Sequence, residues 1–311
     1  MIISASRRTD IPAFYSQWFI NRIKDGFVLV PNPFNPKMVS KVQLNPSVVD
    51  CIVFWTKNPT PMIPKLELLT DYKYYFQFTL NPYGNDIECN LPDLQKRIEI
   101  FKRLADKIGK EKVVWRYDPI FLNDKYTVQF HKNTFAQIAH GLRDHTERCM
   151  LGFIDHYPHI RTEMHRHNIK LLKMEDIRNM ALSFKETIGQ YSIHLDTCTV
   201  KVDLTDMGIP QGMCVDKELV EKITGYPISA KKDKNQRDVC KCIESIDIGM
   251  YESCLNGCIY CYAIKGNNES VMNNRKVHDE KSPILIGNIE NDMQIKEREI
   301  RSLRNNQISL F

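Results

Sequence analysis

Three cysteines in the last fifth of the chain, Cys254, Cys258 and Cys261, are separated by three and two residues. Thiolates this close together on one loop can bind three irons of a [4Fe–4S] cluster, which leaves the fourth iron without a protein ligand. An open iron can bind a small molecule. A radical-generating cluster needs such an iron, whereas an electron-transfer cluster does not. A zinc knuckle is the alternative, but it normally uses paired Cys-x2-Cys units and four ligands.

The Cys-x3-Cys-x2-Cys pattern, with Tyr260 directly before its last cysteine, resembles the cluster loop of the radical S-adenosylmethionine (radical SAM) superfamily. The resemblance implies that S-adenosylmethionine binds the open iron, and that one electron cleaves it to a 5′-deoxyadenosyl radical. It also implies that Tyr260 lies near the adenine. Over nearly its whole length the chain is similar to uncharacterised bacterial proteins with this loop near the C-terminus. More distantly, it is similar to spore photoproduct lyase.

Four further cysteines, Cys198, Cys214, Cys240 and Cys242, form a second set. Four thiolates satisfy a closed [4Fe–4S] cluster or a tetrahedral zinc ion. The resemblance implies that the family carries cysteines at these positions too and that they bind a metal. We expect an auxiliary [4Fe–4S] cluster here, with structural zinc and unliganded thiols as the alternatives.

Six short apolar or β-branched runs predict strands that are buried on both faces of a parallel sheet. These runs are Ile2–Ser6, Cys51–Trp55, Tyr74–Leu80, Val113–Tyr117, Cys149–Ile154 and Ser192–Asp196. Apolar stripes between them, such as the one over Leu94–Ile108, predict amphipathic helices. The alternation predicts an α/β fold with parallel strands, and we expect a partial (β/α)6 barrel. A doubly wound sheet is the alternative.

The domain organisation follows from where this alternation stops. We expect the partial barrel over residues 1–200, a cysteine-rich iron–sulfur region over 201–266, and a C-terminal tail over 267–311 that packs on the barrel or docks a partner. The core of the radical SAM fold is also a six-stranded partial barrel, but its cluster loop normally follows the first strand. Here the loop is appended after the sixth strand. Within the tail, the charge spacing of Met293–Leu303 is compatible with a helix.

Polar residues follow the first predicted strand. Ser6, Arg7 and Arg8 are expected at its carboxyl end, where active sites of such barrels lie. The two arginines could clamp a phosphate or a carboxylate of the cofactor. The alternative is a helix N-cap at Thr9 or Asp10 with solvated arginines, because Ile-Pro follows directly.

Two further sites carry charge at positions where it could act on a ligand. Arg116 and Asp118 end the fourth predicted strand just before a proline, and we expect a catalytic pair there, with a structural ion pair as the alternative. A similar Arg-x-Asp-Pro stretch occurs in proteins resembling spore photoproduct lyase. Arg237 ends a basic run that could steer the carboxylate of S-adenosylmethionine or a substrate phosphate. A solvated loop is the alternative for that run.

The composition limits the class of the protein and the compartment in which we expect it. The 311 residues are 42% hydrophobic and 26% charged, as in ordinary globular proteins, and no apolar run approaches the ~18 residues of a membrane span. The ten cysteines and the lack of a signal-peptide pattern predict a reducing, cytoplasmic location. We assign no role to Cys51, Cys89 or Cys149. The net charge of +5 points only weakly to a phosphate-rich partner such as nucleic acid.

The sequence ends with Gln307–Phe311, which resembles the short peptide by which bacterial repair and replication proteins dock on the sliding clamp. Such a peptide inserts a Leu-Phe anchor into a preformed pocket. The alternative is an apolar end that packs on its own domain.

Together these features predict a radical SAM enzyme that abstracts a hydrogen atom from an unknown substrate, with a nucleic acid or nucleoside as the first candidate. Its cofactors would be a [4Fe–4S] cluster and S-adenosylmethionine, with an electron donor such as flavodoxin or ferredoxin. The alternative is a non-catalytic iron–sulfur or zinc protein that acts as a redox-sensing or nucleic-acid-binding module.

Overall fold

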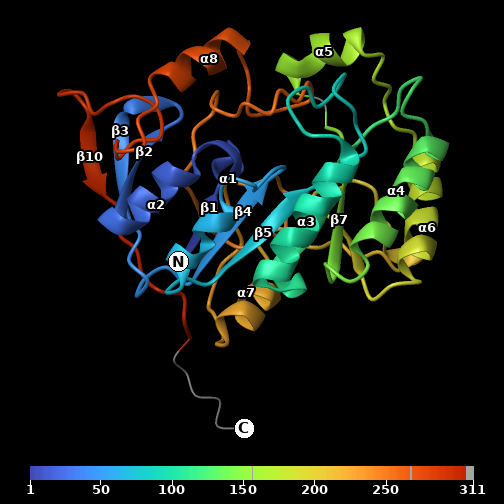
Figure 1. The fold of residues 1–311 in the computed structure, drawn as a ribbon, viewed down its shortest axis with the longest axis horizontal. Helices are drawn as coiled ribbons and strands as arrows, with labels where there is room; N and C mark the ends of the chain where they lie inside the picture. The colour runs from blue at the N-terminus through green and yellow to red at the C-terminus, as the bar shows by residue number, and fades with distance from the viewer. Residues whose placement is uncertain (156, 267, 306–311) are drawn as a thin grey trace.

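A seven-stranded sheet forms the centre of the molecule, and every pair of neighbouring strands in it is parallel (Figure 1). The computed structural model describes residues 1–155, 157–266 and 268–305. From one edge to the other, the strands are β8 (His194–Thr197), β7 (Arg148–Phe153), β6 (Val113–Ile120), β5 (Tyr74–Thr79), β4 (Cys51–Thr56), β1 (Ile2–Ala5) and β9 (Ile246–Asp247).

The predicted α/β class with a parallel sheet is confirmed, and six of the strands coincide with the six predicted runs. These six also stand in chain order across the sheet, as successive right-handed strand–helix–strand units produce. The seventh strand, β9, was not predicted. It brings residues 246–247 beside β1, so the chain returns to the first strand shortly before the loop of Cys254.

Helices connect the strands, and α3, α4 and α6 lie together on one side of the sheet (Figure 1). The helices are α1 (Ile11–Phe14), α2 (Ser16–Asp25), α3 (Leu94–Ile108), α4 (Val128–Leu142), α5 (Arg161–Arg166), α6 (Met174–Ile188), α7 (Lys217–Thr224) and α8 (Asn268–Lys276). Short 3₁₀ turns span Ile63–Leu69, Lys110–Lys112, Pro158–Ile160 and Thr205–Met207.

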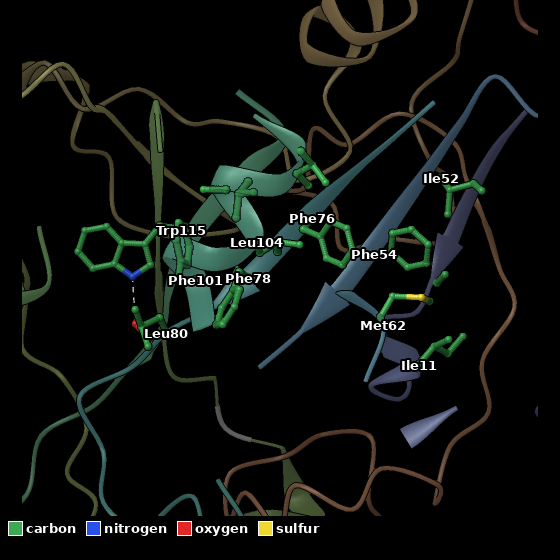
Figure 2. Packing of buried hydrophobic residues seen from close by; sticks show 14 of the residues in the cluster. Ile11, Ile52, Phe54, Met62, Phe76, Phe78, Leu80, Phe101, Leu104 and Trp115 are labelled. Atoms are coloured by element: carbon green, nitrogen blue, oxygen red, sulfur yellow. Dashed lines mark hydrogen bonds between the residues drawn. The ribbon is translucent and has the colours of Figure 1, made fainter. Parts of the chain in front are cut away.

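Alternate residues of each strand face the helices and form the main core. Figure 2 shows Phe54 and Phe76 from neighbouring strands packed together, and their ring centroids are 4.8 Å apart. Phe78 contacts Phe101 of α3, with 4.9 Å between the ring centroids. Trp115 is fully buried and donates its indole N–H to the Leu80 carbonyl at 3.0 Å. Buried aromatic rings of this size contribute strongly to core stability. Their packing therefore holds the sheet and the helices on this face together.

The other face of the sheet packs against the segment that carries three of the second-set cysteines. Strand residues such as Val53, Tyr75 and Met150 form one buried cluster with Cys214, Cys240 and Cys242. The region 213–243, which includes α7, therefore covers this face. Because its cysteines are packed directly on the strands, the sheet and not a mobile loop sets their positions.

A smaller sheet lies beside α2 at the opposite end of the molecule from α4 and α6 (Figure 1). Its strands are β2 (Phe27–Asn32) and β3 (Asn35–Gln43), which are antiparallel, and β10 (Gln294–Glu297), which is parallel to β3. The prediction of a helix over Met293–Leu303 is wrong. Charge spacing gives a helix only a weak preference, and pairing with the edge of β3 outweighs it.

The tail also contacts the helical layer. Trp18 of α2 donates its indole N–H to the Ser282 carbonyl at 2.8 Å, and Arg22 donates to the Lys281 carbonyl at 2.9 Å. Residues 281–282 are thus held against α2. Throughout the described part of the chain, every helix is too short or too polar to cross a membrane.

Candidate functional site

A cavity of about 470 Å³ lies at the carboxyl ends of the parallel strands. Active sites of α/β proteins lie at this edge because several strand ends and their loops meet there. The structure brings all of the sequence-predicted site residues to its wall. These are Ser6, Arg7, Arg8, Arg116, Asp118, Cys198, Cys214, Arg237, Cys240, Cys242, Cys254, Cys258, Tyr260 and Cys261.

The loop of Cys254, Cys258 and Cys261 forms one wall, and backbone hydrogen bonds hold it in place. Ile259 N–H donates to the Ile87 carbonyl at 3.1 Å, and Asn90 N–H donates to the Asn256 carbonyl at 3.2 Å. The loop is therefore fastened along the segment that follows β5. The positions of its three sulfurs depend on that segment as well as on the loop itself.

The three loop cysteines are half-buried and free, and burial raises the pKa of each thiol. Backbone N–H groups near two of the sulfurs partly offset this rise in pKa: those of Asn256 and Asp10 near Cys254, and those of residues 263 and 264 near Cys261. Such N–H groups stabilise a thiolate and are typical of the surroundings of bound metal clusters. The donor set thus fits an iron–sulfur cluster. As the side chains stand, however, the described residues contain no group of three or more His, Cys, Asp or Glu that could hold a metal ion.

Asp10 joins the loop to two strand ends. One carboxylate oxygen caps α1 by accepting from Ala13 N–H at 3.0 Å. The other accepts from Lys57 N–H at 2.8 Å and from the Asn256 amide at 3.0 Å. The alternative prediction of an N-cap at this position is therefore confirmed, and the same carboxylate also orients the cysteine loop.

Tyr260 is buried at the cavity wall within a network of charged groups. Its hydroxyl donates to Glu88 and accepts from Lys57 Nζ at 2.9 Å. Glu88 is also 2.7 Å from Lys57 Nζ and 2.7 Å from Arg97 Nη1. Burial raises the pKa of Glu88, but the two cations outweigh that effect and hold it below its usual value. Because Glu88 is ionised, the Tyr260 ring is held in one orientation.

The second-set cysteines lie close together on the wall formed by residues 198–242, and we call these four residues the cysteine tetrad. The sulfurs of Cys198 and Cys214 are 2.6 Å apart. The sulfur of Cys242 accepts N–H donors from Cys214 at 3.2 Å and from Val215 at 3.4 Å. Hydrogen bonds from Cys214 and Cys240 lower the pKa of Cys242 below that of an ordinary thiol. The tetrad therefore favours a thiolate at Cys242.

Arg116 connects the tetrad with the rest of the cavity. Its Nη1 is 2.6 Å from the Cys214 sulfur, and its Nη2 donates to Asp118. Arg116 and Arg7 both lie over the Trp55 ring, at 5.1 and 5.2 Å from its centroid. The Nη2 of Arg7 is buried and has no hydrogen-bond partner. Two guanidinium groups therefore border the space between the two cysteine sets.

The remaining predicted residues have partners within the protein. Ser6 donates its hydroxyl to Asp247 at 2.6 Å, so it fixes the end of β1 against β9. Arg8 lies over the Tyr251 ring at 5.2 Å, and Arg237 pairs with Asp155. Of these, the two arginines remain close enough to the opening to contact a ligand, since neither side chain is fully buried.

Several cavity residues were not predicted as site residues, among them Trp55, Tyr157, Tyr251 and Tyr262. Tyr157 and Tyr262 have ring centroids 5.7 Å apart. Trp55 ends a predicted strand, so its position at the strand end was an available signal. The three tyrosines belong to irregular segments, where no periodicity in the sequence indicates what they face.

A family model described as "Domain of unknown function (DUF1848)" matches residues 2–263. The chain belongs to the DUF1848 family. The matched stretch of DUF1848 contains the cysteine tetrad and the loop cysteines, and it ends just after Cys261. No curated protein matches the chain, and no solved structure does. The resemblance to radical SAM enzymes and to spore photoproduct lyase stays a prediction. The proposed clamp-docking peptide, Gln307–Phe311, lies outside the described residues.

Proposed function

We propose that this DUF1848 protein is a radical SAM enzyme whose Cys254, Cys258 and Cys261 hold a [4Fe–4S] cluster with one open iron. The main support is that these three cysteines face the same cavity as the carboxyl ends of six parallel strands in chain order. That arrangement is compatible with a partial (β/α)6 barrel whose mouth carries the cluster. The backbone N–H groups near Cys254 and Cys261, which partly offset the rise in the pKa of these thiols, support the same assignment.

With one electron from a donor such as flavodoxin or ferredoxin, the bound cluster and S-adenosylmethionine would supply a 5′-deoxyadenosyl radical that takes a hydrogen atom from the substrate. The protein's own residues bind and orient. Tyr260, held by Glu88 and Lys57, offers a fixed ring at the cavity wall. Arg116 and Asp118 present a charged pair at the end of β6, where they can orient a polar group of the substrate.

The lining of the cavity supports a nucleoside or nucleic acid as substrate. It includes Tyr157, Tyr251 and Tyr262 together with Arg8 and Arg237. Aromatic rings stack on bases and arginines pair with phosphates, so this combination suits a nucleotide unit. A cavity lined with seven free cysteines also suits a reducing compartment, and we place the protein in the cytoplasm.

The test is anaerobic reconstitution with iron and sulfide, followed by addition of S-adenosylmethionine and dithionite and measurement of 5′-deoxyadenosine. We expect formation of 5′-deoxyadenosine that is lost in Cys258→Ala. The matched control is Cys89→Ala, since Cys89 is exposed and lies outside this cavity. This variant should keep the wild-type yield.

Absence of 5′-deoxyadenosine from fully iron-loaded protein, with a panel of nucleosides and oligonucleotides present, would contradict the proposal. It would favour the alternative of a non-catalytic iron–sulfur or zinc module for redox sensing or nucleic-acid binding. That module would keep its affinity for an oligonucleotide without S-adenosylmethionine, which a gel-shift titration measures.

A further inference from the structure

We infer that the cysteine tetrad (Cys198, Cys214, Cys240 and Cys242) is a second metal site with four thiolate ligands, built into the wall opposite the loop cysteines. The site does not depend on cleavage of S-adenosylmethionine. It would exist equally in a radical enzyme and in a protein without radical chemistry.

The first argument is the way in which the four sulfurs meet. They come from three segments: Cys198 follows β8, Cys214 precedes α7, and the pair at 240 and 242 precedes β9. Cys198 contacts Cys214, the sulfur of Cys242 accepts from Cys214 N–H at 3.2 Å, and Cys240 packs in the same buried cluster as Cys214 and Cys242. The four side chains thus form one continuous group, although up to 44 positions separate them in the chain. Convergence of separate segments on one point is what a metal site of four thiolates requires.

Buried cysteines that serve only in packing look different in this protein. Cys51 and Cys149 are fully buried within strands of the sheet. The sulfur of Cys51 faces the Ile52 carbonyl at 3.8 Å, and Cys149 packs in the main core among apolar residues. Both behave as small hydrophobic residues. In the tetrad, sulfurs instead contact another sulfur and N–H donors, so these buried thiols have polar partners.

The second argument is charge. A zinc ion with four thiolates carries a net charge of about −2, and so does an oxidised [4Fe–4S] cluster with four thiolates. Two guanidinium groups border the tetrad: Arg116 contacts the Cys214 sulfur at 2.6 Å, and Arg7 lines the same cavity and lies over the Trp55 ring, as Arg116 does. The buried Nη2 of Arg7 lacks a hydrogen-bond partner within the protein. Since an unpaired buried donor is costly, an anionic metal centre at this place would supply its missing partner.

The described residues hold no ready-made metal site, so metal binding requires the tetrad to rearrange. The sulfurs of Cys198 and Cys214 are 2.6 Å apart, whereas Zn–S bonds of ~2.3 Å at tetrahedral angles place sulfurs about 3.8 Å apart. A [4Fe–4S] cluster needs a wider separation. A zinc ion and a [4Fe–4S] cluster would both use the same four thiolates. The experiment therefore supplies zinc to one sample, and iron together with sulfide to another.

The test begins with a variant that lacks the loop ligands, Cys254→Ala/Cys258→Ala/Cys261→Ala, in the full-length chain. One sample is loaded anaerobically with Zn²⁺ alone and another with Fe²⁺ and sulfide, and both are desalted before metal analysis. We expect either about one zinc ion or about four irons per chain, with a four-sulfur shell in X-ray absorption. Adding Cys240→Ala/Cys242→Ala should abolish this binding. Adding Cys51→Ala/Cys149→Ala instead should leave it unchanged.

The inference is overturned if the folded loop variant retains no stoichiometric metal in either arm, or if its metal survives removal of Cys240 and Cys242. A Cys198–Cys214 disulfide in the metal-free protein isolated from cells would overturn it as well. Should the loop variant fail to fold, alkylation of the wild-type chain followed by mass spectrometry decides. In that experiment, bound metal must protect all four tetrad cysteines from alkylation. Equal alkylation with and without metal would contradict the site. Because metal content and 5′-deoxyadenosine are separate readouts, failure of the proposed function would leave this result intact.

Discussion

Lys57 and Glu88 form a buried ion pair at the wall of the cavity, with 2.7 Å between Nζ and Oε1. The pair joins the end of β4 to the segment that holds the cysteine loop, because Glu88 forms an isolated β-bridge with Cys258. Arg97 of α3 supplies a second cation to the same carboxylate at 2.7 Å. One carboxylate therefore balances two buried cations and at the same time positions the loop.

Replacement of Glu88 by glutamine should lower stability strongly. Glu88→Gln keeps the shape of the side chain but leaves Lys57 and Arg97 without their counter-charge in a region where both side chains are largely or fully buried. Breaking a buried pair by removing one partner costs about 3–5 kcal/mol. We expect a loss of this size in the free energy of unfolding, measured by urea titration followed by circular dichroism.

The matched control for this variant is Glu67→Gln, which removes an exposed carboxylate paired with Lys107. Exposed pairs contribute little because water screens them. We expect the midpoint of the urea transition of this control to equal that of the wild type. A Glu88→Gln protein as stable as this control would mean that the buried network does not hold the loop.

His131 should make stability depend on pH between about 6.5 and 4. Its Nδ1 is 2.8 Å from the Tyr117 hydroxyl and its Nε2 is 2.8 Å from the Phe121 carbonyl, so the neutral ring donates from Nε2 and accepts at Nδ1. Burial lowers the pKa of His131 to about 4. The unfolded chain takes up this proton near pH 6.5 and the folded chain only near pH 4, so stability is lost as the pH falls through this range. The total loss is about 3 kcal/mol.

The measurement is the free energy of unfolding of wild type and His131→Gln at several pH values from 7.5 to ~4. The difference between the two proteins should shrink as the pH falls, since the variant has no group to protonate at this position. His140→Gln, near the end of the same helix and exposed, should keep the wild-type profile. Parallel profiles for wild type and His131→Gln would exclude this histidine as the source.

Most strands of the sheet were predictable because they are largely apolar runs that are buried on both faces, and this pattern is visible without knowledge of the partner strand. β9 has only two residues, Ile246–Asp247, and no pattern can be recognised over that length. All four residues of β10 are exposed, so its strand character comes from pairing with β3 and not from its own sequence. Local patterns predict buried elements well and short edge strands poorly.

The same distinction applies to the site. The cysteines and the arginines at the strand ends could be predicted to meet, because the carboxyl ends of parallel strands share one edge of the sheet. The role of Glu88 could not be predicted, since its partners Lys57 and Tyr260 lie 31 and 172 positions away along the chain. Neither could the proximity of Gly152 to Asp118, where a Cβ on the glycine would lie 2.2 Å from the carboxylate. Such relationships depend on how the loops pack and leave no periodic signal.

Two substitutions of Tyr260 should separate the role of its ring from that of its hydroxyl. Tyr260→Phe removes the hydroxyl that donates to Glu88 and accepts from Lys57 and Asn81, and we expect a loss of about 1–3 kcal/mol in the free energy of unfolding, with iron content unchanged. Tyr260→Ala also removes the ring that packs against Tyr83 and Phe121. If the ring stacks on the adenine of S-adenosylmethionine, its loss weakens cofactor binding about 5- to 150-fold, because a stacked base is worth about 1–3 kcal/mol.

Anaerobic calorimetry of S-adenosylmethionine binding to the iron-loaded proteins measures this difference. Tyr260→Phe should bind within about threefold of the wild type, because the ring is retained. Equal affinity in Tyr260→Ala would show that the ring serves only to pack the loop, and Tyr260 would no longer be assigned to the cofactor.

The contact between Arg116 and Cys214 predicts that this arginine strengthens metal binding at the tetrad. Arg116→Gln removes a cation 2.6 Å from one of the sulfurs and leaves Asp118 without its partner. Loss of a group that contacts a metal ligand typically lowers metal affinity 10–100-fold. Competition with a zinc-binding dye, in the variant without the loop cysteines, measures the change. Arg116→Lys keeps the charge without the planar fork and should recover part of the affinity. Arg143→Gln, which changes an exposed arginine far from the tetrad in sequence, should have no effect; an equal loss in that control would mean that the effect of Arg116 is not local.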